Sequence, residues 1–418
     1  MNTRRFSAWA FLLCAGVARA EAEAPTLGLP GAEEPAPAAL QVTPPVLTDS
    51  SAAGPLPAVP TPLRIENSLA SLRFGFILQP QFESVGSPIL DGMSHNLYVR
   101  RVRLVFGATL FDRIEVYIDT DYPDLFKASP PEGNGVKNTP GMNVQNAFGT
   151  VKVLDDLLKI DLGYMFTPNS HNSIEAVNAL YGWDYFANTF RHSDSFSTTS
   201  DPFGRDAGVQ LRGLVLDDWL EYRVGLFQGR RRPASEGRVA ARNAFRVAGR
   251  LQVNFLDPET DFFYQGTYLG AKRLASIGAS FDWQPGPGDF ESYKHFGVDG
   301  IFDHELGPGL LTAQVDYQHW NGEDWLVDAL LPEQNANMGE VGYLFWGPRL
   351  SPIFRFERRW VAGPDTAAAF DETRVGGGLA YWPYAHNFNV KAFYTHVHPD
   401  SAPENYEQIN VQAQFFVF

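Results

Sequence analysis

Arginines recur in this sequence at spacings that would place their guanidinium groups on one face of an extended strand. Arg101 and Arg103 are separated by one residue, and Arg246 and Arg250 by three. Successive side chains of a strand point to opposite faces, so both members of each pair would point the same way. Guanidinium groups bind anions through a rigid fork of N–H donors. This spacing therefore predicts a surface that binds or guides anions.

Other residue types that could do chemistry are poorly arranged for it. Ser170 and His171 are only adjacent in sequence, which puts their side chains on opposite faces of an extended chain, whereas a hydrolase needs a nucleophile, a base and an orienting group together. His396 and His398 would share a strand face, and His386 precedes them, but this spacing is generic for a metal site. We predict no enzymatic activity, no metal site and no cofactor.

The composition favours strands and turns over helices. Aromatic residues make up 14% of the chain and charged residues only 19%, and there are 38 glycines and 30 prolines. The longest apolar stretch, from Phe6 to Ala18, is shorter than the roughly 18 residues of a membrane-spanning helix. The net charge of −15 disfavours binding to nucleic-acid phosphates. We therefore exclude a helical membrane protein and expect no nucleic-acid partner.

The first 65 residues divide into two segments with different compositions. Residues 1–20 have basic residues at Arg4 and Arg5, an apolar stretch, and small residues at Ala18 and Ala20, which is typical of a secretory signal peptide cleaved after Ala20. Residues 21–65 are rich in proline and alanine and should form a disordered tether. The single cysteine, Cys14, lies in the expected signal peptide, so we expect no disulfide in the mature chain.

From residue 66 to residue 418 the sequence consists of alternating segments separated by turn signals, which is typical of an outer-membrane β-barrel. Most joins alternate between tight turns and longer loops, and the join at 257–271 is an exception. We count about sixteen strands, near 69–83, 95–110, 113–122, 143–154, 157–167, 205–216, 218–229, 243–257, 272–284, 293–304, 309–320, 337–347, 351–360, 371–383, 387–398 and 404–418.

The alternation assigns one face of each strand to lipid and the other to water. In NLYVRRVRLVFGATL, Leu104 and Phe106 share one face while Arg101 and Arg103 share the other. A soluble β-sandwich would also alternate. The signal peptide, the even strand number and the alternating end at Phe418 favour an all-β transmembrane antiparallel barrel in the bacterial outer membrane. Its expected partners are outer-membrane lipid, lipopolysaccharide and the barrel-assembly machinery.

The segment 168–204 is the longest join and is expected to fold into the barrel and narrow it. It carries Arg191, and Arg205 follows it. The alternative is an external lid. Aromatic residues could anchor the segment to the wall: Trp183, Tyr185, Phe186 and Phe190.

Several segments together resemble one known family. LYVRRVRLVFGATLFDRIEVYIDTDY, VQNAFGTVKVLDDLLKIDLGYMFTPNS, FGRDAGVQLRG, and YRVGLFQG ahead of FRVAGRLQVNF occur in the order found in the phosphate-selective porin O and P family. The resemblance covers roughly residues 70 to 418. It implies a sixteen-stranded barrel, usually a homotrimer, that passes small inorganic anions along a ladder of arginine and lysine side chains.

Strand parity places nearly equal numbers of basic and acidic side chains on the water-facing wall. The predicted function is passive conduction of small anions, with phosphate as the leading candidate. The alternatives are a general or cation-preferring porin and, from another class, a structural or adhesive barrel without conductance. The predicted pore-lining and anion-binding residues are Arg101, Arg103, Arg191, Arg205, Arg212, Arg223, Arg246, Arg250, Arg355, Arg359, Arg374 and Lys391; parity adds Arg73 and Lys159 to the basic wall residues.

Overall fold

The computed structural model describes most of the chain after residue 62. The described residues are 63–87, 92–128, 136–186, 204–229, 244–286, 291–322, 333–362, 371–400 and 405–418. The expected signal peptide, nearly all of the expected tether, Phe190 and Arg191 lie outside them. Within these ranges no helix combines the length and the hydropathy needed to cross a bilayer.

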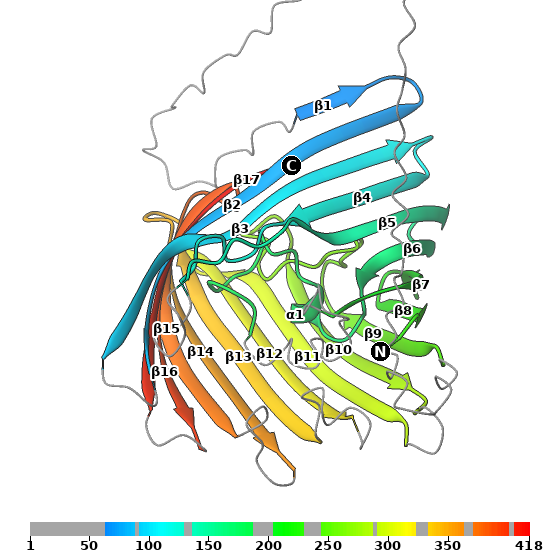
Figure 1. Cartoon of the computed structure of the whole chain (residues 1–418). Helices are drawn as coiled ribbons and strands as arrows, with labels where there is room; N and C mark the ends of the chain where they lie inside the picture. Colours follow the sequence, from blue (N-terminus) through cyan, green and yellow to red (C-terminus); the bar gives the residue numbers. More distant parts are fainter. Residues whose placement is uncertain are drawn as a thin grey trace, which may run out of the picture. The chain divides into compact units, whose positions relative to one another are not determined.

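Antiparallel strands pair in sequence order and close into a barrel (Figure 1). The last strand pairs with β2, and β9 pairs with β10, so the ring has no open edge. The sixteen strands of the ring are β2 (Ala70–Gly86), β3 (Met93–Leu110), β4 (Ile114–Asp121), β5 (Asn143–Leu154), β6 (Leu158–Phe166), β7 (Arg205–Val215), β8 (Leu220–Phe227), β9 (Arg246–Asn254), β10 (Leu274–Gln284), β11 (Tyr293–Leu306), β12 (Gly309–Asn321), β13 (Gln334–Phe345), β14 (Leu350–Val361), β15 (Glu372–Tyr384), β16 (Phe388–Pro399) and β17 (Tyr406–Val417). The predicted fold class and strand count are confirmed.

A short additional strand, β1 (Leu63–Glu66), continues the edge of β2 beyond the end of β17. Val417 pairs with Phe76, and Leu63 then pairs with Phe74 on the same strand. The sequence pattern does not predict this strand, because residues 63–65 belong to the expected tether.

The two ends of the barrel differ in the length of their connections. One end, called the turn end here, carries the C-terminus and tight turns. Asp112, Asp155 and Asp217 have left-handed backbone conformations in three of these turns. Aspartate tolerates this conformation better than most residues, so the LFDR, LDDL and LDDW sequences suit tight hairpin turns. The opposite end, the loop end, carries the longer connections.

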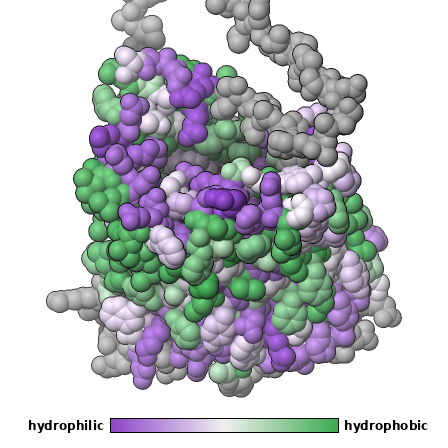
Figure 2. All heavy atoms as spheres, turned by 180° about the vertical axis from the view of Figure 1, so that it is seen from behind, coloured by the Kyte–Doolittle hydropathy of each residue, from purple (hydrophilic) through white to green (hydrophobic). Residues whose placement is uncertain are grey.

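The outer surface of the barrel is hydrophobic. Leu104 is 58% exposed and Leu251 is 55% exposed, and both lie on strands whose arginines are buried. Hydrophobic side chains dominate the middle of the face drawn in Figure 2, with hydrophilic side chains above and below them. The observed strand faces therefore match the predicted alternation of lipid-facing and inward residues.

Candidate functional site

Two segments fold into the barrel from opposite ends and meet inside it. The first, the 167–186 loop, follows β6 at the loop end and includes the single-turn helix α1 (His171–Ile174). The second, the 255–273 segment, joins β9 to β10 at the turn end. Their backbones are hydrogen bonded: the Ala176 N–H donates to the Tyr264 carbonyl at 2.9 Å, and the Gly266 N–H donates to the Ala179 carbonyl at 3.0 Å. The barrel interior thus contains two interlocked segments.

The described part of the expected constriction contacts inward-facing wall residues. The inward position of the 255–273 segment was not predicted from the sequence. The signal available was the join at 257–271, which was the one long connection at the end where all others are tight. A long connection that is also rich in aromatic residues, as FFYQGTYLG is, can bury itself in a barrel.

A buried histidine fastens the two segments together. His171 Nδ1 lies 2.9 Å from Glu175 in its own loop, and His171 Nε2 lies 3.0 Å from Glu259 in the opposite segment. The imidazole also stacks on the Tyr264 ring at 4.5 Å. Burial opposes a charge on His171, but Glu259 and Glu175 outweigh it and raise the pKa of His171 to about 10. We call this cluster of His171, Glu175, Glu259 and Tyr264 the histidine latch.

The two glutamates of the histidine latch have different environments. Burial raises the pKa of Glu175 to about 7. Burial also acts to raise the pKa of Glu259, but the attraction of His171 and hydrogen bonds from His171, Tyr268 and Gln252 outweigh it and lower that pKa. Glu259 is therefore the main counter-charge of the protonated imidazole.

Cationic wall residues hold the 167–186 loop in place. Arg101 donates to the Asp184 carboxylate at 2.6 Å, and Arg355 donates to the Asp184 carbonyl at 2.7 Å. Lys391 donates to the carbonyls of Leu180 and Gly182 at 2.6 and 2.7 Å. Three of the predicted anion-binding residues thus bind the protein's own chain.

Another group of wall cations holds the 255–273 segment. Lys159 and Arg212 both donate to the Thr260 carbonyl, at 2.8 and 3.0 Å. Arg223 donates to the Phe262 carbonyl at 2.7 Å and lies over the Tyr264 ring at 4.3 Å. These contacts explain how a segment without regular secondary structure keeps its backbone oxygens satisfied inside the barrel.

Most wall arginines also pair with acidic side chains. Arg103 contacts Asp119 and Asp121 at 3.0 and 3.1 Å. The remaining predicted residues have these partners: Arg212 pairs with Asp161, Arg223 with Glu221, Arg246 with Asp282, Arg250 with Asp299, Arg355 with Glu340 and Arg374 with Glu372, while Arg205 bonds Asn146 and lies over Phe166. Arg359 is buried on β14, and Arg191 lies outside the described residues.

These placements change the expected charge and accessibility of the barrel interior. Arg101, Arg246 and Arg250 are each no more than 2% exposed, so water in the barrel hardly touches them. Within the described ranges, buried acidic side chains outnumber buried basic ones, and the inward segments contribute Glu175, Asp184 and Glu259 to the acids. The near-neutral balance predicted for the wall from strand parity did not include these acids.

The inward face is not uniformly polar. The inward-facing side chains of Val105 and Phe148 pack with Phe262 in one buried cluster, and Ile353 and Trp382 belong to another. The expectation that the inward face meets water is therefore wrong in these places. The two inward segments cover the apolar wall residues and bury them.

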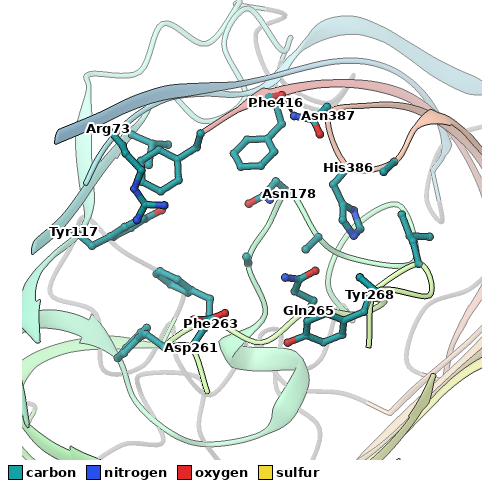
Figure 3. A pocket seen from close by; sticks show the side chains of 18 of the residues that line it. Arg73, Tyr117, Asn178, Asp261, Phe263, Gln265, Tyr268, His386, Asn387 and Phe416 are labelled. Carbon is teal, nitrogen blue, oxygen red and sulfur yellow. Dashed lines mark hydrogen bonds between the residues drawn. The ribbon is translucent and has the colours of Figure 1, made fainter. Parts of the chain in front are cut away.

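A cavity of about 970 Å³ lies among the 255–273 segment, the 167–186 loop and the turn end of the wall (Figure 3). Many of the side chains around it are aromatic: Tyr117, Phe148, Phe262, Phe263, Tyr268, Trp346, Phe416 and Phe418. Arg73 projects into the cavity toward the Tyr117 ring, and Asn178, Gln265 and His386 line other parts of it. Burial lowers the pKa of His386 to about 4, so this side chain is neutral at pH 7.

The three histidines considered for a metal site have other contacts. His386 Nε2 lies 2.9 Å from the Thr267 carbonyl. His396 contacts Glu407 at 2.8 Å, and His398 contacts Asp400 at 3.1 Å. In the described ranges the structure holds no group of three or more His, Cys, Asp or Glu side chains placed to hold a metal ion.

The chain has the porin fold. An anion-selective porin from Comamonas acidovorans aligns with 83% of this chain and 99% of its own, with a TM-score of 0.54 and 10% identity. Salmonella typhi OmpF, solved with daunomycin, covers 84% and 100% of the two chains with a TM-score of 0.55 and 12% identity. The outer membrane channel DcaP of Acinetobacter baumannii covers 84% and 98% with a TM-score of 0.51 and 12% identity. No protein-family model and no curated protein sequence matches the chain.

Proposed function

We propose that this protein is an outer-membrane porin that passes small solutes, small anions such as phosphate among them, by passive diffusion. The observation that carries the proposal is the division of charge across the closed wall. Charged side chains such as Arg103 and Asp119 point inward while leucines and phenylalanines point outward. A lipid-facing exterior with a polar interior is the design of a transmembrane channel.

The orientation of the barrel in the membrane follows from this proposal. The turn end would face the periplasm, because short turns and chain termini lie there in outer-membrane barrels. Membership of the phosphate-selective porin O and P family and assembly into a homotrimer are part of the proposal, and they rest on the sequence resemblance. The anion-selective porin among the similar structures is compatible with anion transport but shares only the fold.

The charges inside the barrel favour a weakly selective channel over a strict phosphate filter. A basic column would favour anions along the whole path. Instead Arg103, Arg246 and Arg250 all have acidic partners. We therefore propose that any preference for anions is modest, and the general or cation-preferring porin remains the competing proposal.

A second candidate function is a barrel without conductance that serves a structural or adhesive role. The observation in its favour is the interlocking of the 167–186 loop and the 255–273 segment across the interior. Reconstitution of the purified protein in planar bilayers separates the candidates. Open-channel current supports the porin, and the reversal potential under a salt gradient gives its ion preference. Absence of current would support the second candidate.

A matched variant makes this test sharper. Replacing residues 257–271 with a short glycine-containing turn removes the segment that enters from the turn end. For a porin narrowed by this segment, single-channel conductance should increase at least twofold while the barrel still migrates as a folded, heat-modifiable band. Shortening the connection between β10 and β11 at the loop end instead should leave conductance unchanged.

A further inference from the structure

We infer that the cavity at the turn end is a binding site for a small aromatic carboxylate. The inference deepens the proposed function, since a solute passing through the barrel would meet this cavity. Its volume of about 970 Å³ is at the upper end of the range for small-molecule sites, which are concave, mostly apolar and provided with a few polar groups. The cavity therefore has room for one aromatic ring with its carboxylate and several waters.

The first element of the site is a cationic group that lacks an acidic partner. Unlike the paired arginines of the wall, Arg73 is exposed, and in the described part of the chain it contacts no carboxylate. Its cross-strand neighbours are Gly107 on β3 and Arg64 on β1. Residues directly opposite one another in an antiparallel pair point to the same face, and like charges placed in this way repel.

This arrangement favours an added anion. Arg64 forms an ion pair with Glu66, whereas Arg73 has no such relief. A carboxylate bound by Arg73 would compensate the excess charge and accept two parallel N–H bonds from the guanidinium fork. Arg73 is thus the group expected to bind the anionic end of the ligand.

The second element of the site is an aromatic wall directly beside this guanidinium. The Arg73 guanidinium lies 4.7 Å from the centroid of the Phe418 ring. Tyr117 meets Phe418 edge to face at 5.9 Å, and its ring lies tilted to that of Phe263 at 5.0 Å. Gly107 leaves the room for this packing, because a Cβ there would lie 2.7 Å from Phe418 Cζ. An aromatic ring attached to the bound carboxylate would contact these rings in offset or edge-to-face geometry.

The acids in the cavity define the competing ligand. Glu115 pairs with Lys152 at 2.5 Å, whereas Asp261 and Glu305 form no ion pair within the described ranges. Glu305 lies near Gly270 and Trp346, whereas Arg73 on β2 lies over the Phe418 ring. If Asp261 and Glu305 controlled recognition, an aromatic amine would bind better than an aromatic acid.

The test is calorimetric titration of the full-length protein in detergent micelles with benzoate, benzylammonium and inorganic phosphate. Benzoate should bind more tightly than the other two probes. Arg73→Gln should weaken benzoate binding about tenfold or more, since a hydrogen bond to a charged group is lost. The matched control is Arg113→Gln, which should leave binding unchanged. Arg113 lies in the β3–β4 turn, is exposed and pairs with Asp155 of the β5–β6 turn.

A second variant keeps the test decisive if Arg73→Gln does not fold. Phe263→Leu retains an apolar side chain and should weaken benzoate at least threefold. The inference is overturned if benzylammonium or phosphate binds as tightly as benzoate, or if folded Arg73→Gln binds benzoate like the unaltered protein. Binding is measured without ion flow. A barrel that conducts but does not bind benzoate would therefore refute the binding site and support the porin. A barrel that binds benzoate but does not conduct would support the binding site and refute the porin.

Discussion

Arg101 on β3 donates a 2.6 Å hydrogen bond to Asp184, which lies 83 residues further along the chain. A wall residue thus directly fixes the position of the 167–186 loop. The same carboxylate accepts from Arg100 at 3.1 Å. Burial would raise the pKa of Asp184, but Arg101 and Arg100 together hold that pKa well below its usual range. The carboxylate therefore stays ionised at any physiological pH, and loop docking here depends on a permanent ion pair.

Removing this charge should loosen the loop without unfolding the barrel. In Asp184→Asn the negative charge is removed, so both arginines can bond only a neutral amide oxygen, and hydrogen bonds to charged groups are worth about 1.5–3 kcal/mol. We expect more frequent conductance fluctuations in single-channel recordings and an unchanged heat-modifiable band. Asp155→Asn, which alters an exposed turn residue, is the control. Recordings indistinguishable from those of the unaltered protein would show that Asp184 does not hold the loop.

The ion pair between Arg250 and Asp299 allows a test of selectivity with opposite expected signs. Arg250 Nη2 donates to Asp299 Oδ1 at 2.6 Å. Arg250→Gln leaves a negative charge and should shift the reversal potential toward cation preference, whereas Asp299→Asn leaves a positive charge and should shift it toward anions. Reversal potentials under a tenfold KCl gradient measure both shifts. If neither variant alters the potential, this pair lies away from the permeation path.

The sequence predicted the barrel well because its signal is repeated in every strand. Arg246 and Arg250 share an inward face, and Leu251 and Val253 point outward, as the alternation required. The interior was predicted less well, because contacts such as that between Lys159 and Thr260 join residues about a hundred positions apart. No local pattern encodes such a contact. The partners of the arginines therefore became visible only in the folded chain.

The lipid-facing surface provides a prediction about stability. Phe106 shares its face with Leu104, which is 58% exposed, whereas Thr109 belongs to the inward set and pairs with Glu115 across β3 and β4. Phe106→Arg places a charge in lipid and should cost about 2–4 kcal/mol if the residue lies near the bilayer midplane. Thr109→Arg places the same group beside a carboxylate and should be tolerated. The yield of folded barrel in detergent gel shifts measures both, and equal yields would indicate a different strand register.

The histidine latch predicts that the interior packing depends on pH. The pKa of His171 in the folded protein, about 10, is above its ordinary value of about 6.5. The stabilisation from protonated His171 is therefore fully present below pH 6.5 and is lost as the pH rises through about 10. Glu175, whose pKa is raised to about 7, changes in the same direction, because its ionisation adds a second buried negative charge. Glu259 has a lowered pKa and contributes above its ordinary value, so docking should be strongest in mildly acidic solution.

Raising the pH from 6 to 10.5 should thus separate the 167–186 loop from the 255–273 segment. Near-ultraviolet circular dichroism should lose intensity as Tyr264 and its aromatic neighbours become less ordered, while the far-ultraviolet spectrum of the barrel stays constant. The neighbouring Tyr268 should stay protonated over this range, because burial and Glu259 raise its pKa. In His171→Gln, which keeps one hydrogen-bond donor but cannot carry charge, the step above pH 7 should disappear and the aromatic signal should be weak throughout. A pH step of the same size in this variant would mean that the latch does not hold the two segments together.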